Sequence, residues 1–157
     1  MICQNSFDLL NFKTPNSRLL GLDVGTKTIG LALSDTRWII ASPLKTLLRT
    51  KMTHDVKELK KILEEFNVAG LVVGLPVNMN GSEGPRCQSV RQFAKDLDHH
   101  CETPLCFWDE RMSTIAVTRT LLEADVSRKR RIQMVDKMAA SFILQGVLDA
   151  FQHFSQA

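Results

Sequence analysis

The sequence predicts an α/β domain built on a five-stranded mixed sheet, with three antiparallel strands followed by two parallel ones, flanked by helices. Two observations predict it. Short apolar runs separated by turn residues follow one another in the first quarter of the chain, and apolar runs then alternate with stretches of helical periodicity. Strands that alternate with helices run parallel to one another, so the two later strands are expected to lie parallel to the first.

The first three elements form an antiparallel meander. Residues 19–24 (LLGLDV) are apolar on both faces, as expected of a central strand. Residues 25–28 supply a turn, and residues 29–35 (IGLALSD) then return antiparallel to the first strand. Residues 38–43 (WIIASP) are expected to form a third strand, which Pro43 ends.

Helix and strand alternate after the meander. Residues 54–66 place apolar side chains at helical spacing and charged ones between them, which predicts an amphipathic helix. Residues 69–76 (AGLVVGLP) are valine-rich and too few for a helix, so they indicate a buried parallel strand. A polar loop (NMNGSEGP) follows, and the apolar stripe within residues 87–97 predicts a second helix.

The last third of the chain contains a short strand and two helices. Residues 104–108 (PLCFW) form the strand, which stops on the two acids at residues 109–110. A serine is placed to cap a helix over residues 113–122. After the basic loop SRKRR (residues 127–131), apolar positions within residues 135–150 predict the final helix.

Length and composition place the chain among ordinary globular proteins. Its 157 residues, 44% hydrophobic and 24% charged, suit one domain, which we assign to residues 18–157 behind a loose N-terminal extension of residues 1–17. The uninterrupted apolar stretches are too short to cross a bilayer, so a membrane protein is excluded. The four cysteines form no CxxC pair, which favours the reducing cytoplasm.

Positive charge is concentrated late in the chain. The net charge is only +3, but the segment from Arg111 to Lys137 contains seven basic residues and only three acidic ones. Arg128, Lys129 and Arg130 belong to the basic cluster and are candidates to follow a nucleic-acid backbone. Because aromatic residues are only 6% of the chain, base stacking is expected to be minor and recognition to depend on shape and phosphate.

Three acids are candidates for one metal site. Asp23 ends the first strand, Glu110 follows the last, and Asp136 begins the final helix. Ligands gather at the carboxyl ends of parallel strands, and clustered carboxylates need a cation to neutralise them. Mg²⁺ or Mn²⁺ would suit such oxygen ligands, and two such ions can activate a water against a phosphodiester. Any one of these acids alone is also compatible with a turn residue, a helix cap or a salt bridge.

Four segments resemble the signature blocks of the YqgF/RuvX family of resolvases and pre-16S ribosomal RNA nucleases, which have an RNase H-like fold. They are D-V-G-T-K at residues 23–27, V-G-L-P-V-N-M-N-G-S-E-G-P-R at residues 73–86, D-E-R-M-S-T at residues 109–114 and V-D-K-M-A-A at residues 135–140. The resemblance covers residues 18 to about 150. It implies a cytoplasmic nuclease that matures the 5′ end of 16S ribosomal RNA during ribosome biogenesis.

The family resemblance also implies site residues. Asp23, Glu110 and Asp136 stand at the family's acidic positions and are expected to be catalytic and to bind the metal. Since neighbours on a strand face opposite ways, only one of Asp109 and Glu110 should point into the site, and we favour Glu110. The candidates to hold substrate phosphates are Lys27, Asn78, Arg86 and Arg111.

Other functions remain open from the sequence. The D-x-G-T pattern also resembles the phosphate loops of actin-like and sugar kinases, although those proteins pair two such domains. A Holliday junction resolvase acting on branched DNA would use the same chemistry but would need a dimer. A third alternative is a non-catalytic RNA-binding ribosome-assembly factor. The expected partners are precursor rRNA, branched DNA or ribosomal precursor particles, with the chain a monomer or a homodimer.

Overall fold

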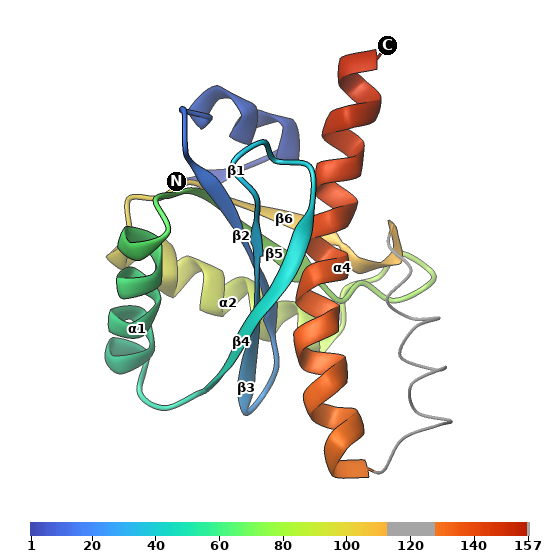
Figure 1. The fold of residues 1–157 in the computed structure, drawn as a ribbon. Coiled ribbons are helices and arrows are strands. Elements are labelled where there is room, and N and C mark those ends of the chain that lie inside the picture. The colour runs from blue at the N-terminus through green and yellow to red at the C-terminus, as the bar shows by residue number, and fades with distance from the viewer. Residues whose placement is uncertain (113–127, 157) are drawn as a thin grey trace.

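The computed structural model describes residues 1–112 and 128–156, and the side chains of residues 1–112 and 138–154. Helices and strands follow one another in the expected α/β order (Figure 1). Their bounds are β1 Ile2–Cys3, η1 Ser6–Phe12, β2 Arg18–Val24, β3 Thr28–Ser34, β4 Ala41–Leu48, α1 Met52–Glu65, β5 Val68–Leu75, α2 Pro85–His100, β6 Leu105–Asp109, η2 Glu110–Met112 and α4 Arg128–Gln156. No helix within these described ranges is both long and apolar enough to span a membrane.

The described strands form one mixed sheet of order β1-β6-β5-β2-β3-β4. The pairs β2–β3 and β3–β4 are antiparallel, whereas β2–β5 and β5–β6 are parallel. This arrangement confirms the mixed α/β class, with β2 in the interior of the sheet. The sheet nevertheless has six strands among the described residues rather than the five expected.

The additional strand comes from the segment that the sequence analysis set aside as a loose extension. Ile2 and Cys3 pair parallel with the start of β6. The short helix η1 follows, with Asn5 closing a capping box at its start and Leu9 fully buried. A two-residue strand and a seven-residue 3₁₀ helix are too short to give a periodic signal, so the sequence did not reveal them. The domain boundary at residue 17 stays a prediction.

The third strand of the meander lies further along the chain than expected. β4 begins at Ala41 instead of residue 38, and it continues through Pro43 to Leu48. Trp38 lies in the preceding turn with φ 60°, and its side chain is buried. Pro43 does not end the strand, because β4 is an edge strand and its pairing with β3 contains a bulge, where the missing N–H is tolerated.

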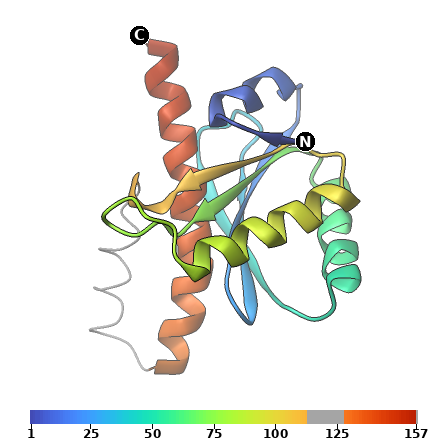
Figure 2. The same cartoon turned by 180° about the vertical axis from the view of Figure 1, so that it is seen from behind.

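Helices cover both faces of the sheet. α1 and α2 pack on one face, and α4 runs along the other (Figures 1 and 2). Successive residues of β2 alternate between them: Leu20 and Leu22 join the core below α1 and α2, whereas Leu19 joins the core below α4. Odd-numbered residues of β2, including position 23, therefore belong to the α4 face.

Glycines allow α4 to lie close to the sheet. A Cβ atom on Gly21 would lie 2.8 Å from Leu144 Cβ and 3.0 Å from the Ala140 carbonyl oxygen. On α4 itself, a Cβ atom on Gly146 would lie 2.8 Å from Trp108 Nε1. The backbone of α4 is thereby fixed against β2 and β6.

The C-terminal part differs from the sequence prediction at the basic cluster and at the start of the final helix. The basic cluster is not a loop, because Arg128, where α4 begins, and the residues after it are helical. The helix predicted over residues 113–122 lies outside the described residues. The final helix is confirmed, but it starts seven residues before position 135, so Asp136 lies two turns inside α4 rather than at its beginning.

Candidate active site

Asp23 occupies the next-to-last position of β2, at the carboxyl end of an interior strand. Its side chain is only 7% exposed. Gly21, two residues earlier, contacts α4, so the alternation of a strand directs Asp23 to the α4 face as well. A carboxylate is costly to bury unless other groups or a cation compensate its charge.

Glu110 lies at the same edge of the sheet, on the other side of β5. β5 pairs with β2 up to Leu22 and Val73, so the next residues along these strands are Asp23 and Gly74. A Cβ atom on Gly74 would lie 3.2 Å from Glu110 Oε1 and 2.3 Å from Ile143 Cδ1 on α4. The Glu110 carboxylate therefore lies over Gly74 on the α4 face, and Asp23 and Glu110 flank the same residue of β5.

The backbone of α4 runs past this edge. Ala140 lies over Gly21, and the far end of α4 stacks Phe151 on Trp38, whose Nε1 donates to Ser17 just before β2 begins. α4 thus runs antiparallel to β2, and residue 136 lies one helical turn from Ala140 toward the carboxyl end of β2. The side chain of Asp136 is outside the described residues, so its part in the site stays a prediction.

Asp109 is engaged elsewhere. Its Oδ1 accepts the backbone N–H of Arg111 at 2.9 Å, and its Oδ2 accepts Arg111 Nη2 at 2.7 Å. The hydrogen bond from the Arg111 guanidinium is the largest influence on the pKa of Asp109 and lowers it. Of the two neighbouring acids, Glu110 is therefore the one that lies over β5. Its binding of a metal stays a prediction.

The predicted phosphate-binding residues divide into two groups. Lys27 is exposed in the turn after β2, and Arg86 is exposed at the start of α2, where its Nη2 donates to the Val24 carbonyl oxygen at 3.4 Å. Both lie next to the end of the strand that carries Asp23. A cavity of about 210 Å³ separates the turn from α2, lined by Val24, Gly25, Thr26, Pro85, Arg86, Ser89 and Val90.

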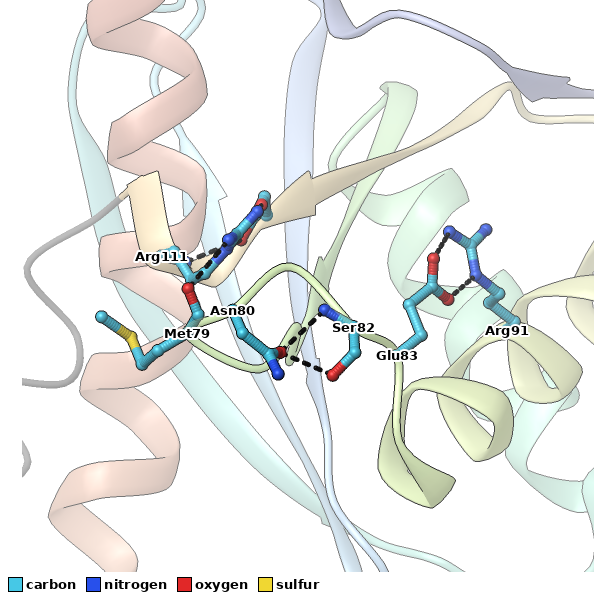
Figure 3. Close-up of polar contacts among 7 residues, drawn as sticks. Met79, Asn80, Ser82, Glu83, Arg91 and Arg111 are labelled. Carbon is cyan, nitrogen blue, oxygen red and sulfur yellow. Dashed lines mark hydrogen bonds and ion pairs between the residues drawn. The ribbon is translucent and has the colours of Figure 1, made fainter.

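Asn78 and Arg111 form hydrogen bonds to residues of the loop between β5 and α2 instead. Asn78 Nδ2 donates to Ser82 Oγ at 3.0 Å. Arg111 Nη1 donates to the Met79 carbonyl oxygen at 3.4 Å (Figure 3). Their binding of substrate stays a prediction, as does that of the side chains of Arg128, Lys129 and Arg130, which lie outside the described residues.

Sequence reasoning missed Arg49. Its Nη1 donates to the Gly25 carbonyl oxygen at 2.7 Å, and its backbone N–H donates to the Lys27 carbonyl oxygen at 2.8 Å. The guanidinium also lies over the ring of Phe93, 5.1 Å from its centroid. Arg49 therefore supports the turn that follows Asp23. It is 24 residues from Gly25 in the chain, and nothing in the local pattern connects the two.

The donors at this edge fit a hard divalent cation. Two carboxylates converge on the α4 face, and carboxylate oxygen is the ligand that Mg²⁺ prefers in proteins. Within the described part of the chain no group of three His, Cys, Asp or Glu residues could hold an ion. Asp23 and Glu110 are the two carboxylates placed here among the described side chains, and the backbone of α4 runs toward them.

Comparison with known proteins gives a consistent answer. A family model described as "RuvX: Holliday junction resolvase" matches residues 17–150. A Paramagnetospirillum magneticum protein named "Putative pre-16S rRNA nuclease" is 59% identical over 142 residues, covering 90% of this chain and 92% of the relative. A Rhodobacter capsulatus protein of the same name is 52% identical over 157 residues, covering 100% and 99%.

Among solved structures, Thermus thermophilus RuvC in complex with a Holliday junction substrate aligns with a TM-score of 0.51 and 9% identity. The alignment covers 87% of this chain and 96% of RuvC. At so low an identity the likeness concerns the fold alone, which is the RNase H-like fold that the sequence motifs implied.

Proposed function

The chain belongs to the RuvX family and is a nuclease that hydrolyses phosphodiester bonds, and we propose that it does so with divalent metal ions held by Asp23, Glu110 and Asp136. One observation carries this proposal. Asp23 and Glu110 come from strands on either side of β5, yet both lie on the α4 face beside Gly74. Neighbouring carboxylates repel unless a cation lies between them, so this placement favours Mg²⁺ or Mn²⁺.

The metal would activate a water and stabilise the oxygen that leaves the phosphorus. The protein's own residues bind and orient the substrate. Lys27 and Arg86, at the end of the strand that carries Asp23, hold phosphates of the substrate backbone beside the acids. Asp23 is buried, and interactions between charges are stronger where water screens them poorly.

For the substrate, we infer precursor 16S rRNA cut at its 5′ end during ribosome biogenesis in the cytoplasm, either as free RNA or within precursor particles. This inference depends on two relatives of that name that align along nearly the whole chain. Arg128, Lys129 and Arg130 are placed together in the first turn of α4, where their positive charge can follow an RNA backbone.

Branched DNA is the second candidate substrate. The family description names a Holliday junction resolvase, and the chain shares its fold with RuvC. Cutting a four-way junction symmetrically needs two active sites and therefore a dimer. Light scattering of the purified protein distinguishes the rRNA nuclease from the junction resolvase, because a monomer at working concentration counts against a resolvase.

The decisive experiment compares Asp23→Asn with wild type on a precursor rRNA fragment and on a four-way DNA junction, with magnesium, manganese or a chelator. Asp55 is a matched control, because it is another buried aspartate and its carboxylate accepts hydrogen bonds from Thr50. We expect metal-dependent cleavage that Asp23→Asn lowers about 100-fold or more, equivalent to about 2.7 kcal/mol of transition-state stabilisation. Asp55→Asn should retain the wild-type rate.

Circular dichroism verifies that both variants are folded. Cleavage by Asp23→Asn at the wild-type rate would refute the role of Asp23. Tight binding of RNA without cleavage in any metal would instead support a non-catalytic RNA-binding factor.

A further inference from the structure

The loop between β5 and α2 (residues 76–84, the β5–α2 loop) is held at two points, by η2 at one end and through α2 by β6 at the other. At one end, Arg111 Nη1 donates to the Met79 carbonyl oxygen while the same guanidinium is paired with Asp109 (Figure 3). At the other end, Glu83 accepts Arg91 Nη2 at 2.8 Å, and the Arg91 guanidinium lies 5.0 Å from the ring centroid of Phe107 on β6.

The β5–α2 loop is also closed on itself. The Asn78 N–H donates to the Ser82 carbonyl oxygen at 3.0 Å, and the Gly81 N–H donates to the Asn78 carbonyl oxygen at 2.8 Å. Asn80 Oδ1 accepts both the backbone N–H and the hydroxyl of Ser82. Gly81 has φ +87°, which a residue with a side chain adopts only with strain. The loop therefore has one well-defined shape and can be positioned as a unit.

Asp109 shapes the turn in which Glu110 stands. By accepting the N–H of the residue two positions later, its carboxylate forms the local turn that aspartate side chains favour, with Glu110 as the residue in between. Arg111 closes this turn with its guanidinium, whose Nε and Nη2 donate to Asp109 Oδ2 at 3.0 Å and 2.7 Å. The direction in which the Glu110 side chain leaves the backbone is thus set by its two neighbours.

We propose that Asp109, Arg111 and the Glu83–Arg91 pair are positioning residues, which fix Glu110 and the β5–α2 loop relative to each other at the metal-binding edge. Asp109 is then not a metal ligand, and Arg111 is not primarily a phosphate-binding residue. The geometry requires arginine at position 111, because its planar fork bonds Asp109 and Met79 at once, whereas a lysine ammonium offers no such fork. This inference rests on the proposed function for the catalytic role of Glu110.

Hydrogen exchange tests the positioning of the loop without any cleavage assay. In Arg111→Lys we expect the N–H groups of Gly81 and Ser82 to exchange about tenfold faster than in wild type, because the loop loses its attachment to η2. Arg37→Lys is the matched control, since Arg37 is an exposed arginine whose side chain makes no hydrogen bond or ion pair within the described residues. Unchanged exchange in Arg111→Lys would refute the positioning role.

Kinetics separate positioning from substrate binding. A positioning Arg111 predicts that Arg111→Lys lowers kcat about tenfold or more with KM nearly unchanged. A phosphate contact predicts instead a raised KM and a weaker dependence of binding on salt, and that result would overturn the proposal.

Asp109→Asn and Glu110→Gln separate the roles of the two acids. Asp109→Asn keeps an Oδ1 acceptor for the Arg111 N–H but loses the charge that pairs with the Arg111 guanidinium, and losing the partner of a metal ligand already weakens metal binding about 10–100-fold. If Asp109 acts through Arg111, Asp109→Asn should raise the metal concentration for half-maximal cleavage much less in the Arg111→Lys background than in wild type. An equal rise in both backgrounds would make Asp109 a ligand and refute the proposal. Full cleavage by Glu110→Gln would count against the proposed function itself, while the exchange result for Arg111→Lys would still decide the attachment of the loop.

Discussion

Replacing Gly74 by alanine tests the packing that holds Glu110 over β5. The new Cβ atom would lie 2.3 Å from Ile143 Cδ1 and 2.9 Å from Ile143 Cγ1, far inside normal contact between carbon atoms, and Ile143 is fully buried. Overpacking a core costs about 1–3 kcal/mol, and so close a contact places the cost at about 2–3 kcal/mol. Lower entropy of the unfolded chain returns about 0.4–1 kcal/mol when glycine becomes alanine.

The net loss in the free energy of unfolding is therefore about 1–2.5 kcal/mol, which lowers Tm by about 2–10 °C in a protein of this size. Urea and thermal unfolding followed by circular dichroism measure both quantities. Because the Cβ atom would also lie 3.2 Å from Glu110 Oε1, cleavage should fall even at temperatures where the Gly74→Ala variant is folded.

A double-mutant cycle identifies the contact responsible. Ile143→Val removes Cδ1 and alone costs about 0.5–1.5 kcal/mol, but it should cost less, or even stabilise, in the Gly74→Ala background. Gly70→Ala is the control on the same strand, because its new Cβ atom would lie 2.9 Å from Leu19 Cδ2 and 3.0 Å from Leu9 Cδ2 rather than against Ile143, so Ile143→Val should not relieve its loss. Losses for Gly74→Ala and Ile143→Val that add within about 0.5 kcal/mol would refute the reasoning.

Two further predictions concern stability. Burial raises the pKa of Asp35, but hydrogen bonds from the backbone N–H groups of Ile40 and Ile39 outweigh burial, so the pKa of Asp35 in the folded protein is lowered. The ionised carboxylate therefore stabilises the fold fully above about pH 4, the ordinary pKa of aspartate. This contribution is lost as pH falls through the pKa of the folded state. Urea unfolding should show Asp35→Asn less stable than wild type at pH 7, with a difference that shrinks toward pH 3; a difference independent of pH would contradict this. Leu9→Ala should cost about 2–5 kcal/mol because Leu9 is fully buried, and a loss below about 1 kcal/mol would show that η1 contributes little.

The sequence predicted the elements whose periodicity is long enough to recognise. α2 carries the apolar stripe expected within residues 87–97, and the five side chains that form it are buried in the structure: Cys87, Val90, Phe93, Ala94 and Leu97. The sequence did not predict β1, which has only two residues, or the passage of β4 through Pro43, which an edge position and a bulge make possible. In these cases the deciding interaction is with a distant strand rather than with neighbours in the chain.

The candidate site likewise combines features that the sequence predicted with features that only the structure revealed. The sequence by itself determined the fold class, the family and the positions of the acids at strand ends, because buried strands and family motifs are local patterns of residues. Only the tertiary structure decided that Glu110 lies over Gly74 while Asp109 is bonded to Arg111, and that Arg49 supports the turn after Asp23. Side-chain direction and long-range hydrogen bonds depend on which strands become neighbours, and no local pattern in the chain records that choice.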